Sequence, residues 1–282
     1  MTFTSSEYSE SKFEGERGTE LYYRNWKPTG RTRAVVVVTH GQGDHGGRYL
    51  HVAKHLTREG FAVWAADLRG HGRSGGRRGH VDNFDDYLAD TRRVIEKVRE
   101  ESPQVKVILL GHSLGGLVVL DYAEKMGSNI SGVIATAPLL RLKMEVPPWK
   151  VAVGKMLSSL RPTLSMKTGL DPNLLSHDQQ TVRNYVNDPL VHGVASARFY
   201  TELLRAVDET LRGGNKLTVP CLVMVGSGDR IVDPSATQEF FKTISSSDKT
   251  LKIYDGLYHE VLNEPEKDSL LGEISAWLSA RT

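Results

Sequence analysis

Short apolar runs recur along the chain, and longer segments with helical periodicity separate them. Runs this rich in valine, leucine and isoleucine predict strands that are buried on both faces, because such strands show no alternation with polar residues. Six of them occupy residues 34–40, 61–70, 105–111, 130–138, 219–229 and 250–256. Their recurrence predicts a single continuous sheet.

The segments between these runs carry apolar residues three or four positions apart, the spacing that places side chains on one face of a helix. They cover residues 48–60, 87–100, 114–126, 234–244 and 266–281. Strands that alternate with helices pair in parallel, so we predict a mostly parallel α/β sheet with helices on both faces. Residues 11–28 precede this alternation and predict an antiparallel hairpin at one edge of the sheet.

The alternation is interrupted between residues 139 and 191, where no strand pattern is present. This segment has five prolines and one stretch with an apolar helical face. The residues of that face are Val146, Trp149, Val153, Met156, Leu157 and Leu160. We expect residues 139–191 to form a cap inserted into a discontinuous core, which consists of residues 1–138 and 192–282.

Composition narrows the class of protein further. The formal net charge is +2 over 282 residues, and the basic residues are dispersed, which gives no reason to expect a nucleic-acid partner. Cys221 is the one cysteine, so no intrachain disulfide can form. The first residues are polar and include glutamates, unlike a secretory signal, and no apolar run is long enough to span a membrane. We therefore expect a cytoplasmic protein.

A serine between two glycines stands where one predicted strand becomes a helix, in the sequence GHSLG at residues 111–115. In a parallel α/β sheet, ligands bind beyond the carboxyl ends of the strands, and Ser113 lies at such an end. A sharp turn there pushes the serine oxygen clear of the backbone, and the glycines remove Cβ atoms that would clash. The start of the helix directs free N–H groups at a nearby anion. These features predict Ser113 as a nucleophile.

A nucleophilic serine needs a base and an acid that orients the base, and in this architecture the acid precedes the histidine in the sequence. Asp229 ends the predicted strand 219–229, and His259 follows the last predicted strand. Asp233 and Asp255 are alternative acids. Six other histidines compete with His259 but occupy positions more typical of structural roles: His40, His51, His55, His112, His177 and His192.

The oxyanion formed in acyl transfer needs two preorganised N–H donors. We assign them to the backbone of Leu114, which follows the nucleophile, and of Gln42, in the glycine loop after the strand 34–40. A second glycine-rich stretch, GHGRSG at 70–75, matches the dinucleotide fingerprint, but polar residues follow it where that motif needs an apolar helix. We expect a solvated loop there rather than a nucleotide or RNA site.

Seven longer motifs, spread over nearly the whole chain, are more specific than the serine turn alone. They are HGQGDHGGRY, DLRGHGRSGG, LGHSLGG, TAPLL, NDPLVHG, LTVPCLVMVGSGDRIVD and KTLKIYDGLYHEVLNEPE. With them the chain resembles the monoacylglycerol lipases of the α/β-hydrolase superfamily. The resemblance implies an α/β-hydrolase fold, a triad of Ser113, Asp229 and His259, and no metal or cofactor. It also implies that the cap covers an acyl tunnel whose polar end, near glycerol, is lined by Asp44 and Arg48, with aspartate where glutamate is common in the family.

The same resemblance implies a serine hydrolase that cleaves long-chain monoacylglycerols to fatty acid and glycerol through an acyl-enzyme. Two alternatives stay open: a lysophospholipase or small-ester carboxylesterase with the same triad, and a non-catalytic lipid-binding protein of this fold. The apolar face of the cap also has two interpretations. It packs inward over the pocket, or it faces outward and docks peripherally on membranes or lipid droplets, with Lys150 and Lys155 near the headgroups.

Overall fold

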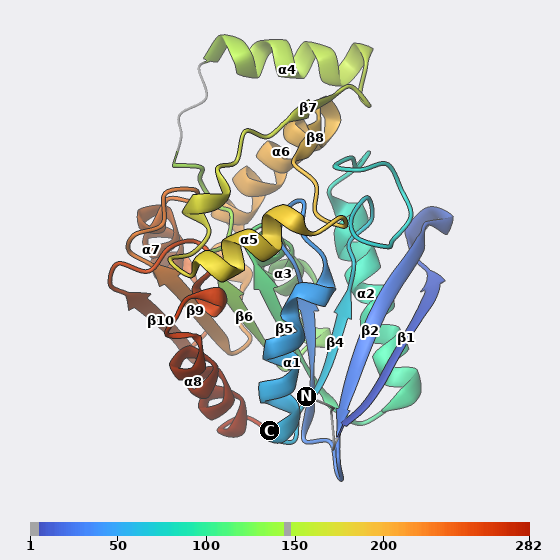
Figure 1. Cartoon of the computed structure of the whole chain (residues 1–282), viewed down its shortest axis with the longest axis vertical. Helices are drawn as coiled ribbons and strands as arrows, with labels where there is room; N and C mark the ends of the chain where they lie inside the picture. The colour runs from blue at the N-terminus through green and yellow to red at the C-terminus, as the bar shows by residue number, and fades with distance from the viewer. Residues whose placement is uncertain (1–5, 144–147) are drawn as a thin grey trace.

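The fold is built on one large sheet (Figure 1). A computed structural model describes residues 6–143 and 148–282, and within them eight strands pair in the order β1-β2-β4-β3-β5-β6-β9-β10. β2 pairs antiparallel with β1 and with β4, whereas the remaining pairs are parallel. The strands are β1 (Ser6–Glu14), β2 (Glu20–Pro28), β3 (Ala34–Thr39), β4 (Ala62–Ala66), β5 (Lys106–His112), β6 (Gly132–Thr136), β9 (Cys221–Gly226) and β10 (Lys249–Tyr254).

Helices cover both faces of this sheet. In β3, Val35 and Val37 pack into one apolar core and Val36 and Val38 into another, because successive side chains of a strand point to opposite faces. The first core is covered by α2 (Asp85–Glu101), α3 (Leu114–Met126), α6 (Ala197–Gly213) and α7 (Pro234–Thr243). The second is covered by α1 (Leu50–Arg58) and α8 (Lys267–Ser279).

The predicted α/β architecture is confirmed, including the mostly parallel sheet and the hairpin at its edge. Each of the six apolar runs overlaps one strand, and each of the five periodic segments overlaps one helix. Several strands are shorter than the runs that predicted them. In β4, for example, the strand ends at Ala66, because Asp67 and the residues after it turn out of the sheet into the glycine-rich loop.

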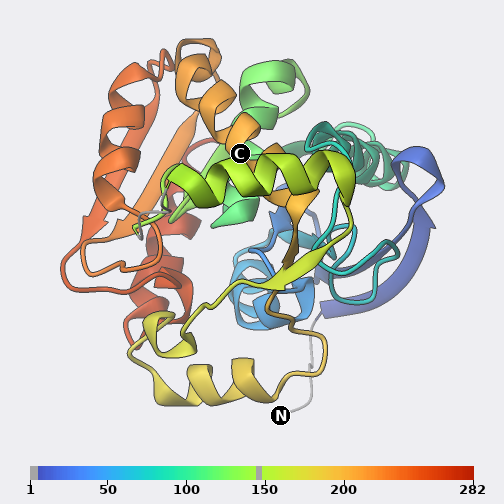
Figure 2. The ribbon, with the colours of Figure 1, turned by 90° about the horizontal axis from the view of Figure 1, so that it is seen from above.

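Residues 139–191 contain α4 (Pro148–Leu160), a 3₁₀ turn η4 (Pro172–Leu174) and α5 (Gln179–Asn187). They also contain β7 (Ser165–Lys167), which pairs antiparallel with β8 (Val194–Ser196). The prediction that this segment holds no strand is therefore wrong, since three exposed residues are too few to show an alternating pattern. Seen from above, α4 crosses over the core and α5 lies along one side of the molecule (Figure 2).

Two small residues of α4, Gly154 and Ser158, face the molecule, whereas Leu157 is half-buried and most of the large apolar residues face outward. Gly154 lies beside the Tyr200 ring of α6, and the hydroxyls of Ser158 and Thr201 are 2.8 Å apart. Four large side chains of α4 are exposed: Trp149, Val153, Met156 and Leu160. Val146 lies outside the described residues, as does the side chain of Lys150. Among the residues described, every helix is too short or too polar to cross a bilayer.

Candidate active site

Ser113 occupies a strained turn between β5 and α3. Its φ of 54° and ψ of −115° lie where side chains are disfavoured, so the surrounding packing must hold the turn. The flanking glycines make the turn possible. A Cβ atom on Gly111 would lie 2.1 Å from the Gly115 carbonyl oxygen, and one on Gly115 would lie 2.0 Å from that of Thr39. Both contacts are far inside van der Waals distance, which explains the spacing that the sequence shows.

Asp229 and His259 meet at the same end of the sheet, although 30 residues separate them. Asp229 follows β9 and His259 follows β10, and His259 Nδ1 lies 2.7 Å from Asp229 Oδ2. The other carboxylate oxygen of Asp229 accepts the backbone N–H groups of Ile231 at 2.8 Å and Val232 at 3.0 Å. Burial alone would raise the pKa of Asp229, but His259 and these N–H groups hold it below its ordinary value. The carboxylate therefore stays ionised and orients the ring.

The histidine ring lies beside the turn that holds Ser113. Its centroid is 4.8 Å from that of His112, the residue immediately before the serine. Burial lowers the pKa of His112 to about 4, so this second ring is neutral near pH 7. With Nδ1 of His259 bonded to Asp229, its Nε2 is the nitrogen available to accept a proton from a hydroxyl.

The glycine loop after β3 packs against the serine. An ideal Cβ on Gly41 would lie 3.4 Å from Ser113 Cβ, which places the loop in contact with the nucleophile turn. The side chain of Gln42 is held at both ends: Nε2 donates to the Val194 carbonyl at 3.0 Å, and Oε1 lies 3.1 Å from His71 Nε2. The two candidate oxyanion donors, Gln42 and Leu114, thus belong to adjoining segments.

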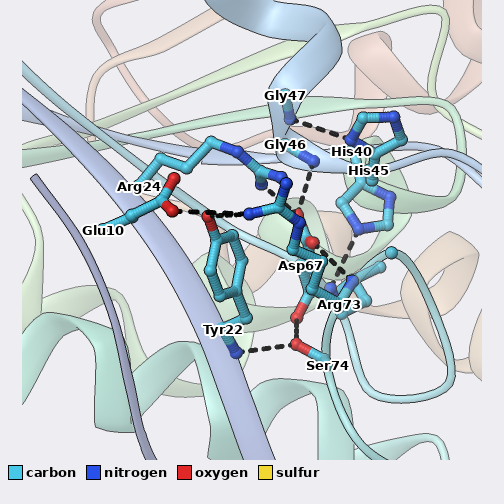
Figure 3. Close-up of polar contacts among 12 residues, drawn as sticks. Glu10, Tyr22, Arg24, His40, His45, Gly46, Gly47, Asp67, Arg73 and Ser74 are labelled. Atoms are coloured by element: carbon cyan, nitrogen blue, oxygen red, sulfur yellow. Dashed lines mark hydrogen bonds and ion pairs between the residues drawn. The ribbon is translucent and has the colours of Figure 1, made fainter. Parts of the chain in front are cut away.

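Asp67 supports the same loop from below (Figure 3). Its buried carboxylate accepts from Arg24 Nη1, from the Gly46 N–H and from the Arg73 N–H, each at 2.8 Å. These bonds join β2, the glycine loop after β3 and the glycine-rich stretch 70–75. That stretch forms turns rather than the start of a helix, and Ser74 within it bonds the backbone of Asp67. The interpretation as a loop is consistent with this geometry.

Arg48, one of the two residues expected near glycerol, is engaged by carboxylates. Its guanidinium bonds Glu260 through both terminal nitrogens, at 2.8 and 2.7 Å, and lies 3.2 Å from Asp44. Burial would raise the pKa of Glu260, but Arg48 lowers it to about 2. Glu260 was not among the residues predicted from the sequence, although its place directly after the candidate base was a usable signal.

Glu264, also unpredicted, joins the loop that carries His259 to the segment 139–191. Its buried carboxylate accepts the N–H of Tyr258 at 2.6 Å, and on the cap side the Ser176 hydroxyl at 3.0 Å and the His177 N–H at 2.9 Å. The N–H of Glu260 donates to the Leu175 carbonyl at 2.8 Å. The residues on both sides of His259 are therefore anchored to the segment 175–177.

The two alternative acids and one competing histidine, His40, have other partners. Asp233 caps α7 by accepting the Ser235 N–H at 3.0 Å, and Asp255 accepts the Ser227 hydroxyl at 3.0 Å. His40 lies 2.8 Å from the Gly41 carbonyl through one nitrogen and accepts the Leu68 N–H through the other. These contacts account for the three side chains without catalysis.

The chain is similar to known hydrolases over most of its length. The family model Hydrolase_4, described as serine aminopeptidase S33, matches residues 30–266. A monoacylglycerol lipase of Mycolicibacterium smegmatis is 36% identical over 97% of the chain and 98% of that protein. Phospholipase YtpA of Bacillus subtilis is 32% identical over 87% of the chain and 94% of that protein. The crystal structure of the Paleococcus ferrophilus monoacylglycerol lipase superposes with a TM-score of 0.83 at 33% identity, covering 98% of the chain and 100% of that structure.

Proposed function

The chain belongs to the Hydrolase_4 family together with the monoacylglycerol lipases, and from this membership we propose that it cleaves long-chain monoacylglycerols to fatty acid and glycerol. It is a carboxylic ester hydrolase of the α/β-hydrolase fold. The observation that carries the proposal is the 2.7 Å contact between Asp229 and His259 beside the strained turn of Ser113. A nucleophile, a base and an orienting acid gathered at one edge of the sheet are what ester hydrolysis requires.

In the first half of the reaction, Ser113 Oγ attacks the ester carbonyl while His259 Nε2 takes the hydroxyl proton. Asp229 stabilises the imidazolium that forms, because its carboxylate is ionised and bonded to Nδ1. The N–H groups of Gln42 and Leu114 donate to the oxyanion. Collapse breaks the ester C–O bond, His259 returns the proton to the glycerol oxygen, and the acyl group remains on Ser113.

In the second half, water attacks the acyl-enzyme. His259 Nε2 takes one proton from the water, the same two N–H groups stabilise the second oxyanion, and collapse releases the fatty acid as the proton passes back to Ser113 Oγ. Asp44 and Arg48 are proposed to line the polar end of the site, where their charges and remaining hydrogen-bonding groups suit the hydroxyls of glycerol. The aspartate reaches less far than the glutamate common in the family.

Turnover of a panel of oleoyl lipids tests the substrate class. We expect monooleoylglycerol to be hydrolysed at least about tenfold faster than dioleoylglycerol, trioleoylglycerol or oleoyl lysophosphatidylcholine, because the similarity to monoacylglycerol lipases favours an ester with one acyl chain and a glycerol leaving group. The similarity to a phospholipase supports lysophospholipid as the second candidate. Faster turnover of lysophosphatidylcholine than of monooleoylglycerol would replace the first assignment with the second.

We also propose that the outward apolar side chains of the cap dock on lipid surfaces. Met156 is 54% exposed and Leu160 is 71% exposed, and Lys155 beside them is exposed as well. Apolar side chains next to a lysine suit an interface with anionic headgroups, where the apolar groups enter the acyl boundary and the ammonium group stays in water.

Vesicle flotation tests this docking. A variant with both Met156→Glu and Leu160→Glu is expected to lose most of its binding to vesicles of phosphatidylcholine and phosphatidylglycerol, since two carboxylates would have to enter the interface. Ile253→Glu is the matched control, because Ile253 is an exposed apolar residue on the edge strand β10, which lies away from α4 (Figure 1). Equal flotation of the double variant, the control and the unaltered chain would rule out docking through α4.

A further inference from the structure

We propose that Glu260 is a positioning residue that, with Arg48 and Asp44, forms a buried charge cluster which orients His259 and stabilises its charged form. The inference rests on the proposed function, since it concerns the same base. It assigns to the cluster a role in the proton transfer, in addition to any contact with glycerol.

Hydrogen bonds connect the residue after His259 to the loop that follows β3. Glu260 follows His259 in the chain, and its side chain is 5% exposed. Both carboxylate oxygens are bonded to Arg48, and Oε2 also accepts from Asn263 Nδ2 at 2.8 Å. Arg48 belongs to the 3₁₀ turn η2 (Gly46–Tyr49), 212 residues away along the chain. A bidentate guanidinium–carboxylate pair fixes direction as well as distance, so it limits rotation of the backbone that carries His259.

The cluster has an excess of one negative charge, because Asp44 and Glu260 are carboxylates and Arg48 is one guanidinium. The charges of the cluster act on His112: Asp44 and Glu260 favour its charged form, and Arg48 disfavours it. The His112 ring is 4.8 Å from that of His259, and Glu260 and His259 interact electrostatically. Among the described residues, the titratable and charged groups around His259 include Asp229, His112 and Glu260 with Arg48 and Asp44. Beyond Tyr258 they include Arg230, whose guanidinium lies over the Tyr258 ring, and Glu264 with His177.

This excess charge matters at the moment of proton transfer. His259 becomes positive when it takes the serine proton, and a buried negative charge nearby stabilises that state more strongly than the same charge in water. Asp229 acts on the Nδ1 side of the ring. The cluster acts through Glu260, which adjoins His259, and through Asp44 in the loop after β3. It is therefore a source of negative charge separate from Asp229.

The acid limb of the pH profile of kcat/KM measures how strongly the cluster stabilises the imidazolium. Glu260→Gln keeps the shape of the side chain but brings the cluster to zero net charge. The limb is then expected to move to lower pH by about half a unit or more, because the imidazolium loses stabilisation. In the double variant Arg48→Gln with Glu260→Gln, Asp44 alone remains, and the net charge returns to one negative. The limb is expected to move back toward its original pH even though activity stays low.

Asn263→Ala is the matched control, because it removes a hydrogen bond to the same carboxylate without changing charge. Its limb is expected to stay in place. p-Nitrophenyl butyrate serves as substrate, since it contains no glycerol and reports no glycerol contact. Thermal unfolding of every variant identifies loss of fold. If the double variant is unstable, comparing the acid limb of Glu260→Gln with that of Asn263→Ala is sufficient to test the role of the cluster charge.

A limb that stays fixed in Glu260→Gln, or that moves equally in Asn263→Ala, would overturn the inference and leave Glu260 as a structural brace. Ser113→Ala measured on the same ester separates this from failure of the proposed function. If Ser113→Ala is inactive while the limb of Glu260→Gln is unmoved, the charge cluster alone is rejected. If Ser113→Ala is active, the reaction itself has been misassigned.

Discussion

Replacing Ser113 with alanine is expected to lower kcat for monooleoylglycerol by about 10⁴-fold or more, because no other group in the site can form the acyl-enzyme. The proposed N–H donors, Gln42 and Leu114, are unchanged in this variant, so we expect a residual rate above the uncatalysed reaction. Alanine tolerates the turn about as well as serine does, since both carry one Cβ at the positive φ of this position. The loss should therefore be chemical. Glycerol release from monooleoylglycerol measures it.

Ser159→Ala provides the control for this variant. Ser159 lies on α4 with its side chain exposed, and its hydroxyl donates to the Lys155 carbonyl of the same helix at 3.4 Å. Its activity and melting temperature are expected to match those of the unaltered chain. Glycerol release by Ser113→Ala at a rate within tenfold of this control would contradict the assignment of the nucleophile.

Asp229→Asn is expected to lower kcat by about 10³- to 10⁴-fold. An amide can accept the two N–H groups of Ile231 and Val232 through its oxygen only by turning its NH₂ group toward His259. His259 Nδ1 would then accept rather than donate, and the proton would move to Nε2, the nitrogen that must take the proton from Ser113. The same change removes the charge that stabilises the imidazolium.

Asp233→Asn tests the alternative acid in the same way. Asp233 caps α7 and pairs with Arg141, so its loss is expected to lower stability slightly and to leave kcat within about twofold. Steady-state hydrolysis of p-nitrophenyl butyrate measures both variants. Equal losses in the two variants, or a larger loss in Asp233→Asn, would reverse the choice of acid.

The parts of the fold that sequence could predict are those with a repeated or local signal. A strand such as β3 shows continuous valines because both of its faces are buried, and α3 begins directly after the glycine-flanked serine. The order serine, aspartate, histidine is also readable, because each residue follows a recognisable strand. Parallel strands end at one edge of the sheet, so residues at their ends are brought together whatever their separation in sequence.

The parts that sequence could not predict depend on pairings between distant residues or on small residues. The sequence around Arg48 does not indicate that Glu260, 212 positions later, accepts hydrogen bonds from both of its terminal nitrogens. The sequence also did not predict which face of α4 packs against the rest of the molecule. Gly154 and Ser158 form the side that packs on α6, so the stripe of large apolar residues faces solvent instead of the core. An apolar face identified by periodicity alone does not say which side of the helix is covered.

Peptide mass spectrometry after labelling the folded chain with a fluorophosphonate tests the central claim most directly, because phosphonylation requires a serine that a neighbouring base activates. We expect one phosphonyl group, located on the peptide that contains Ser113, and a strongly reduced yield when His259 is replaced by alanine. A folded chain that stays unlabelled, or a label confined to a different residue, would contradict it.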